Sequence, residues 1–101
     1  MTYAIVWKRN HGPYYAGMLE LAPNHVHLVG GGVPEAQCDV RYDELEDVQL
    51  QRSSEAKSVW EPALVLSTRS GDRIAIGSLE GVGALHELAD SVANGRSRAA
   101  A

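Results

Sequence analysis

The amino-acid sequence predicts a mainly β protein, a seven-stranded antiparallel sheet curled into an open barrel or sandwich and capped by one amphipathic C-terminal helix. Two observations predict this fold class. Apolar and polar residues alternate with a period of two through most of the chain before residue 78, as half-buried strands require. From residue 78 onward, apolar residues recur at spacings of three and four, which is the pattern of an amphipathic helix.

Composition limits the classes of protein that this chain can be. Its 101 residues are the size of one domain with one core. The 13 acidic and 9 basic residues give a formal net charge of -4, which disfavours binding to nucleic acid. The single cysteine, Cys38, excludes a disulfide scaffold and a cysteine-rich zinc site. We find neither a secretory leader nor an apolar run long enough to span a membrane, so we expect a cytoplasmic protein.

The strands are delimited by turn residues. We predict them at residues 2–7, 14–21, 25–29, 38–43, 48–52, 64–69 and 73–77. Gly12–Pro13 marks the first loop, Pro23–Asn24 a tight hairpin turn, and Ser70–Asp72 the turn of the last hairpin. Between the fourth and fifth strands, the Tyr42–Leu45 segment predicts a turn that brings Leu45 into the core.

The helix is predicted to begin at Ser78, whose hydroxyl suits an N-cap, and to end at Asn94–Gly95, where glycine suits the left-handed C′ position. Its apolar stripe consists of Leu79, Val82, Leu85, Ala89 and Val92, with Leu88 at the border. Gly81 and Gly83 indicate either a frayed start or a close approach to the sheet. Residues 1–95 should therefore form a single domain, and residues 96–101 a flexible C-terminal tail.

Several segments resemble the bacterial pleckstrin-homology (PH)-like domains. They are Gly17–Leu21, His25–Gly30, Val40–Val48, Leu64–Asp72 and the final helix, and the resemblance covers roughly residues 14–94. It implies seven strands with one capping helix. The shared motifs concern packing and turns, so they speak to the fold and hardly to an activity.

The resemblance also implies a place for an anionic ligand. In that fold the loops after strands one, three and six meet at one open end, where eukaryotic members bind inositol phosphates. Lys8, Arg9, His11 and Arg73 are the corresponding candidate ligand-binding residues here. The denser basic motif of lipid-binding members is missing from residues 14–18, and the alternative is that these charges only solvate the loop ends.

Two histidines raise the question of a metal site. His25 and His27 share one face of a strand, about 6.6 Å apart, which is close enough to share an ion. A third ligand would have to come from His11, Cys38 or Asp39 through the fold. The alternative is a pair of surface histidines, and we expect neither a bound metal nor another cofactor.

We find no catalytic constellation in the sequence, and we expect a protein that is not an enzyme. Cys38 lies on the predicted inner face of its strand, where a thiol has no thiolate character. The glycines at 30–32 do not precede the Lys-Ser/Thr pair of a phosphate loop, and the acidic turn at 43–47 lacks the spacing of a calcium loop.

Large aromatic residues instead suggest binding. Trp7, Tyr14, Tyr15 and Trp60 are candidate interface residues, although Trp60 could equally fill the edge of the core. The leading hypothesis is a small non-catalytic module that binds a protein partner or a second copy of itself. The alternatives are an anionic-ligand or membrane-surface module that uses the basic loop residues, and a metal-dependent protein that uses the two strand histidines.

Overall fold

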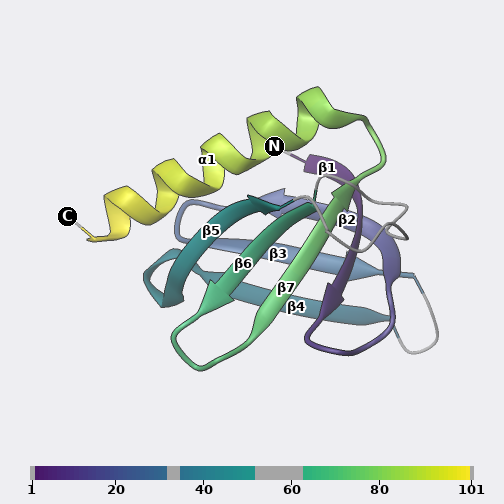
Figure 1. Cartoon of the computed structure of the whole chain (residues 1–101), viewed down its shortest axis with the longest axis horizontal. Helices are drawn as coiled ribbons and strands as arrows, with labels where there is room; N and C mark the ends of the chain where they lie inside the picture. Colours follow the sequence, from purple (N-terminus) through teal and green to yellow (C-terminus); the bar gives the residue numbers. More distant parts are fainter. Residues whose placement is uncertain (1, 32–34, 52–62, 101) are drawn as a thin grey trace.

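The computed structural model describes residues 2–31, 35–51 and 63–100 of the chain. The strands are β1 (Thr2–Arg9), β2 (Tyr15–Leu21), β3 (His25–Gly30), β4 (Ala36–Arg41), β5 (Leu45–Gln51), β6 (Ala63–Thr68) and β7 (Arg73–Ser78). A 3-10 turn lies at Tyr42–Glu44, and the helix α1 spans Val82–Ala100. The predicted fold class is confirmed: seven antiparallel strands are followed by one C-terminal helix (Figure 1).

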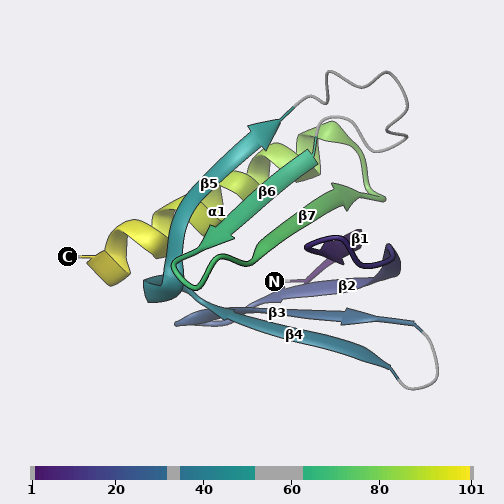
Figure 2. The same cartoon turned by 60° about the horizontal axis from the view of Figure 1, so that its bottom comes forward.

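All seven strands belong to one sheet in the order β4-β3-β2-β1-β7-β6-β5. Every neighbouring pair is antiparallel, and β1 joins the two halves of the sheet by pairing with both β2 and β7. The sheet curls strongly, so that β2–β4 form one wall and β5–β7 the other (Figure 2). The strands at the two ends of this order, β4 and β5, are not paired with each other, which makes the sheet a half-barrel.

The core lies inside the curl, where the alternation along each strand places the apolar side chains. On β1, Tyr3, Ile5 and Trp7 are buried, and on β3 the same holds for Val26 and Leu28. The other inner positions come from β2, β4, β6 and β7, namely Leu19, Cys38, Val40, Leu64, Leu66, Ile74 and Ile76. The predicted turn after β4 is confirmed, because Tyr42–Glu44 form the 3-10 turn and Leu45 is buried behind it.

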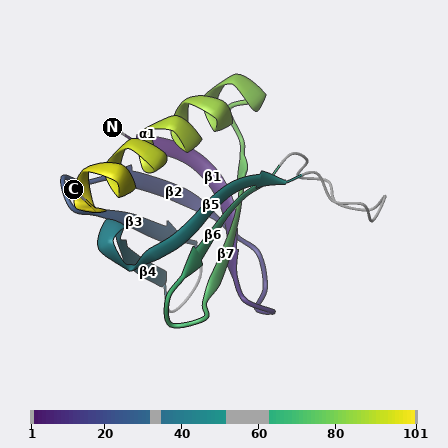
Figure 3. The same ribbon diagram turned by 60° about the vertical axis from the view of Figure 1, so that its left-hand side comes forward.

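Helix α1 covers the inner face from the side of β5–β7, as Figure 3 shows. Leu85, Leu88 and Val92 are fully buried against the core. Leu88 therefore lies at the centre of the apolar stripe rather than at its border. Leu79 and Val82, which were predicted to belong to the stripe, are 49% and 51% exposed.

The helix begins later than predicted. The Ser78 hydroxyl does accept the backbone N–H of Glu80, at 3.0 Å, but this bond closes a turn ahead of the helix. Leu79 is still tied to β1, since its N–H donates to the carbonyl of Ala4 at 3.0 Å, and the Glu80 carboxylate accepts the Ala4 N–H at 3.1 Å. Gly81, with φ +106°, then turns the chain into α1. These contacts with β1 keep residues 78–80 out of the helix.

The helix also ends later than predicted. It passes through Asn94 and Gly95 without stopping, so residues 96–100 are its last turns rather than a tail. Gly95 is buried against the ring of Tyr42, and it provides space there instead of a left-handed cap. Arg96 donates hydrogen bonds to the backbone carbonyls of Leu45 and Glu46, which anchors this part of the helix to the start of β5.

Candidate functional site

The basic loop end is held together by its own hydrogen bonds. Arg9 forms an ion pair with Asp72 at 2.7 Å, and the Asn10 amide donates to the other carboxylate oxygen at 3.0 Å. Asn10 in turn accepts the backbone N–H of Arg73 at 2.9 Å. The hydrogen bonds from Asn10 and Arg9 hold the pKa of Asp72 below its usual value. The structure thus joins the β1–β2 and β6–β7 loops, two of the three loops that the resemblance implied would meet.

The four predicted ligand-binding residues differ in whether their side chains already have an interaction partner. Arg9 is engaged by Asp72, and the Lys8 ammonium lies over the ring of Tyr14, 5.1 Å from its centroid. His11 and Arg73 are exposed. The carboxylate of Asp72 offsets part of the positive charge on which anion binding would depend. Phosphate binding at this end stays a prediction.

The aromatic residues predicted for an interface lie in different environments. Trp7 is 2% exposed, and its indole N–H donates to the carbonyl of Val29 at 3.0 Å, so it is a core residue rather than a surface anchor. Tyr15 is half-buried beside it, with ring centroids 5.1 Å apart. Tyr14 is 46% exposed. Trp60 lies outside the described residues.

The strand histidines lie on the outer face of the sheet, with both side chains half-buried. His27 is paired with Asp39 of β4 in the strand register, and its Nδ1 atom hydrogen-bonds the Asp39 carboxylate. Cys38 is on the opposite, inner face, where burial raises the pKa of its thiol. Over residues 2–31, 35–51 and 63–100, no group of three or more histidine, cysteine or acidic side chains could hold a metal ion.

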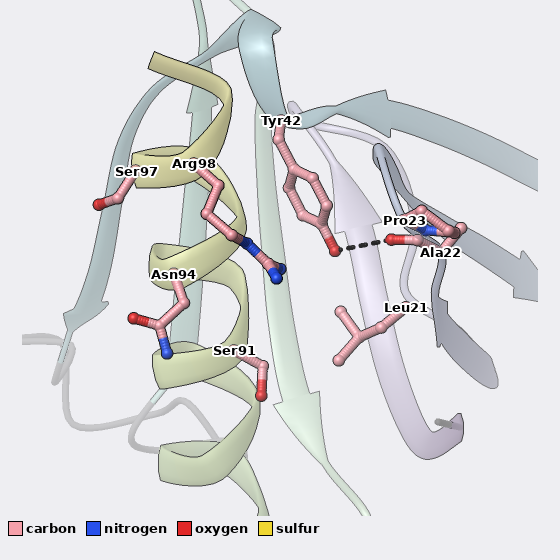
Figure 4. A pocket seen from close by; sticks show the side chains of 8 residues that line it. All are labelled: Leu21, Ala22, Pro23, Tyr42, Ser91, Asn94, Ser97 and Arg98. Atoms are coloured by element: carbon pink, nitrogen blue, oxygen red, sulfur yellow. Dashed lines mark hydrogen bonds between the residues drawn. The ribbon is translucent and has the colours of Figure 1, made fainter. Parts of the chain in front are cut away.

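A groove lies between the C-terminal half of α1 and the β2–β3 turn (Figure 4). We call it the helix-end groove. Its volume is about 660 Å³, and it is lined by Leu21, Ala22, Pro23, Tyr42, Ser91, Asn94, Ser97 and Arg98. The turn residues supply an apolar side, and the helix supplies hydroxyl, amide and guanidinium groups.

Tyr42 forms the inner end of this groove. Its ring is buried, and its hydroxyl donates to the carbonyl of Ala22 at 3.2 Å. Burial raises the pKa of this hydroxyl, and the nearby positive charge of Arg98 opposes that rise. Figure 4 shows Arg98 extending from α1 toward Tyr42, with Ser91 on the same side of the helix. The groove therefore combines a fixed floor with polar groups that a ligand could meet.

A second, smaller groove of about 390 Å³ lies on the other side of the same helix turns. It shares Tyr42 and Ser97 with the first, and Arg69 and Arg96 also line it. The guanidinium of Arg96 is occupied there by the two β5 carbonyls. We therefore regard the helix-end groove as the better candidate binding site.

Sequence reasoning did not find the helix-end groove. Its lining comes from three separated segments, at 21–23, 42 and 91–98. The sequence pattern shows no partner for the polar helix residues, and Ser97 and Arg98 fall in the predicted tail. One signal in the sequence could have revealed them. Ala89, Val92 and the small residue Gly95 recur every three residues, so the buried face of the helix can continue for one more turn.

The fold and the groove define a class of protein: a curled antiparallel half-barrel with a C-terminal helix, PH-like in general shape. Comparison with protein-family profiles and with characterised proteins finds no sequence match. A solved structure shares the fold: the C-terminal domain of an unknown protein from Leishmania infantum, at 19% identity and a TM-score of 0.71, over 91% of this chain and 81% of that one. In the part of the chain that the structure describes, no helix is long and apolar enough to cross a membrane.

Proposed function

We propose that this chain is a small non-catalytic interaction module of the bacterial PH-like kind, and that it binds a segment of a protein partner in the helix-end groove. The observation that carries the proposal is the groove itself, with an apolar side from the β2–β3 turn and hydrogen-bonding side chains from α1. Apolar contact supplies affinity for a peptide segment, and a few placed polar groups supply orientation.

The position of the groove also supports this function. Leu88 and Val92 anchor the helix side of the groove in the core. The buried Tyr42 holds the β2–β3 turn side, because its hydroxyl donates to the carbonyl of Ala22. A binding surface on such a scaffold loses little conformational entropy when a partner docks.

The anionic-ligand alternative receives less support. Asp72 is held within the cluster of loop residues on which that alternative depends, and it forms an ion pair with Arg9 at 2.7 Å. A ligand phosphate would have to compete with this carboxylate for the same guanidinium.

Selection of peptides from a random displayed library on the immobilised chain tests the proposal. We expect selected peptides to bind the wild-type chain and to lose binding when Asn94→Trp fills the groove. Ala93→Trp is the matched control, because Ala93 is the preceding, exposed helix residue and lines neither groove. If every selected peptide still bound Asn94→Trp, the proposed site would be contradicted.

Size-exclusion chromatography with light scattering on the same three proteins tests whether the partner is a second copy of the chain. An oligomer of the wild-type chain and of Ala93→Trp that dissociates in Asn94→Trp would assign the groove to self-association. A monomer in all three proteins, together with groove-dependent peptides, would assign it to a different protein.

A further inference from the structure

The basic side chains of the described residues differ in whether they already have a partner. Arg9 and Arg41 form ion pairs with aspartates. Arg96 donates to backbone carbonyls, and Lys8 lies over a tyrosine ring. Arg98 has no hydrogen bond or ion pair to any of residues 2–31, 35–51 and 63–100, and it lines the helix-end groove.

Two further arginines are unpaired in the same described part of the chain, but neither lies in this groove. Arg73 is exposed among the basic loop residues and lines neither groove. Arg69 lines the smaller groove, together with Asp43. Arg98 is thus the one cation among the described residues that line the helix-end groove.

The charge of the groove differs from that of the whole chain. The described residues that line it include one guanidinium and no carboxylate, whereas the chain carries a net charge of -4. Asn94 and Ser97, which also line the groove, carry amide and hydroxyl groups that can donate hydrogen bonds to an anion. A ligand group with a single negative charge would match this lining.

We propose that the helix-end groove recognises a carboxylate-bearing peptide segment, with the carboxylate bound by Arg98 and an adjacent apolar side chain lying against Leu21 and Pro23. This inference rests on the proposed function and specifies the chemistry of the partner. A planar guanidinium and a carboxylate can form two parallel hydrogen bonds, which fixes orientation as well as charge. A phosphate dianion would leave one charge unmatched by a single arginine.

Arg98 also has a simpler explanation. It lies in the last turn of α1, where a cation complements the negative end of the helix dipole. That explanation requires no ligand and predicts no effect of Arg98 on peptide binding. A binding measurement therefore separates the two explanations.

The experiment uses the peptides selected on the full chain, resynthesised with an amidated C-terminus. We expect an acidic residue to be enriched in them. Replacing that residue by its amide should weaken binding about tenfold, and Arg98→Gln should weaken binding of the acidic peptide by a similar factor. Arg98→Gln should not weaken the amide peptide further, because the same interaction has already been removed.

Arg73→Gln is the matched control, since it removes an unpaired, exposed arginine outside the groove and should leave affinity unchanged. Thermal unfolding of both variants verifies that they fold. Selected peptides that need a free C-terminus, and bind as amides only weakly, would identify the terminal carboxylate rather than a side chain as the bound group.

Two outcomes would overturn the carboxylate assignment and leave the proposed function in place. In the first, peptides that lose binding in Asn94→Trp carry no carboxylate. In the second, such peptides bind Arg98→Gln as tightly as the wild-type chain. If no selected peptide lost binding in Asn94→Trp, both the proposed function and the carboxylate assignment would be overturned.

Discussion

At the scale of single residues, the contact between Gly95 and Tyr42 sets how closely α1 approaches the sheet. A Cβ atom at Gly95 would lie 2.8 Å from carbon atoms of the Tyr42 ring, well inside the ordinary carbon–carbon contact distance. The ring has little freedom to move, because it is 4% exposed and its hydroxyl is bonded to Ala22. Glycine is therefore required at position 95 by space rather than by backbone conformation.

Replacing Gly95 with alanine should destabilise the protein. Overpacking costs about 1–3 kcal/mol, whereas the better helix propensity of alanine returns about 1 kcal/mol. Gly83→Ala is the matched control: it lies in the same helix with nothing within 4 Å of the added Cβ, so it should be neutral or stabilising. Urea unfolding measures both variants. Equal stability of Gly95→Ala and Gly83→Ala would contradict the assigned contact.

The surroundings of Asp72 predict that the stability of the protein depends on pH. Hydrogen bonds from Asn10 and Arg9 favour its charged form, so its pKa is lower in the folded than in the unfolded chain. A carboxyl with a lowered folded-state pKa stabilises the protein fully above its unfolded pKa, at about 4. That contribution is lost as the pH falls through the lower folded-state value.

Asp72→Asn should therefore destabilise the chain at pH 7, and the difference from wild type should narrow as the pH falls below about 4. Urea unfolding of both proteins across this range measures the effect. Arg9→Gln removes one of the partners of Asp72 and leaves Asn10 in place, so the pH dependence of its stability should be intermediate. A difference that is constant from neutral to acidic pH would show that the Asp72 charge does not stabilise the loops.

At the scale of secondary-structure elements, Arg96 connects the last turns of α1 to the edge strand β5. Its Nε donates to the Leu45 carbonyl at 3.3 Å, and its guanidinium also bonds the Glu46 carbonyl. Arg96→Ala should lower the stability by about 1 kcal/mol and raise amide exchange in residues 96–100 and at the start of β5. Arg98→Ala removes the arginine two positions later, which has no hydrogen bond or ion pair among the described residues, so it should change stability and amide exchange less than Arg96→Ala does.

Hydrogen exchange followed by NMR, together with urea unfolding, compares the two arginine variants. Protection in residues 96–100 that is unchanged in Arg96→Ala would mean that the helix end is held by other contacts. Loss of protection in Arg98→Ala would show that its charge stabilises the helix terminus.

The strands could be predicted from the sequence because each one carries its own signal. Burial on one face imposes a period of two on every strand, and the turn residues between strands are local. The ends of α1 could not be predicted in this way. They are set by contacts with distant elements, namely Glu80 with β1, Gly95 with Tyr42, and Arg96 with β5.

The candidate site was hidden for a related reason. Residues of the β2–β3 turn, the 3-10 turn and α1 meet only in the folded chain, and serine, asparagine and arginine on a helix are ordinary solvent-facing residues by pattern. Asp72, the ion-pair partner of Arg9, lies 63 positions away in sequence. The sequence pattern around the basic residues therefore could not show that a carboxylate neutralises part of their charge.

At the scale of the whole molecule, both walls of the half-barrel and the helix contribute to one continuous core. Buried residues from β1 (Ile5), β3 (Leu28), β6 (Leu66) and α1 (Leu88) belong to the same cluster. The helix contacts mainly β5–β7 and the 3-10 turn, yet its apolar side chains complete the core for the other wall as well. Neither wall has a core of its own, so the sheet and the helix should unfold together.

This cooperativity can be tested with Trp7, which is buried in β1 and lies far from α1 in sequence. The chain has two tryptophans, so a Trp60→Phe background makes Trp7 fluorescence a probe of the sheet alone. Far-UV circular dichroism, which reports secondary structure, follows α1. In that background Leu88→Ala should cost about 2–5 kcal/mol and shift both transitions equally. Val82→Ala, at an exposed position of the same helix, should shift neither. A helix signal that is lost before the Trp7 signal would show that α1 is a separable cover and not part of the core.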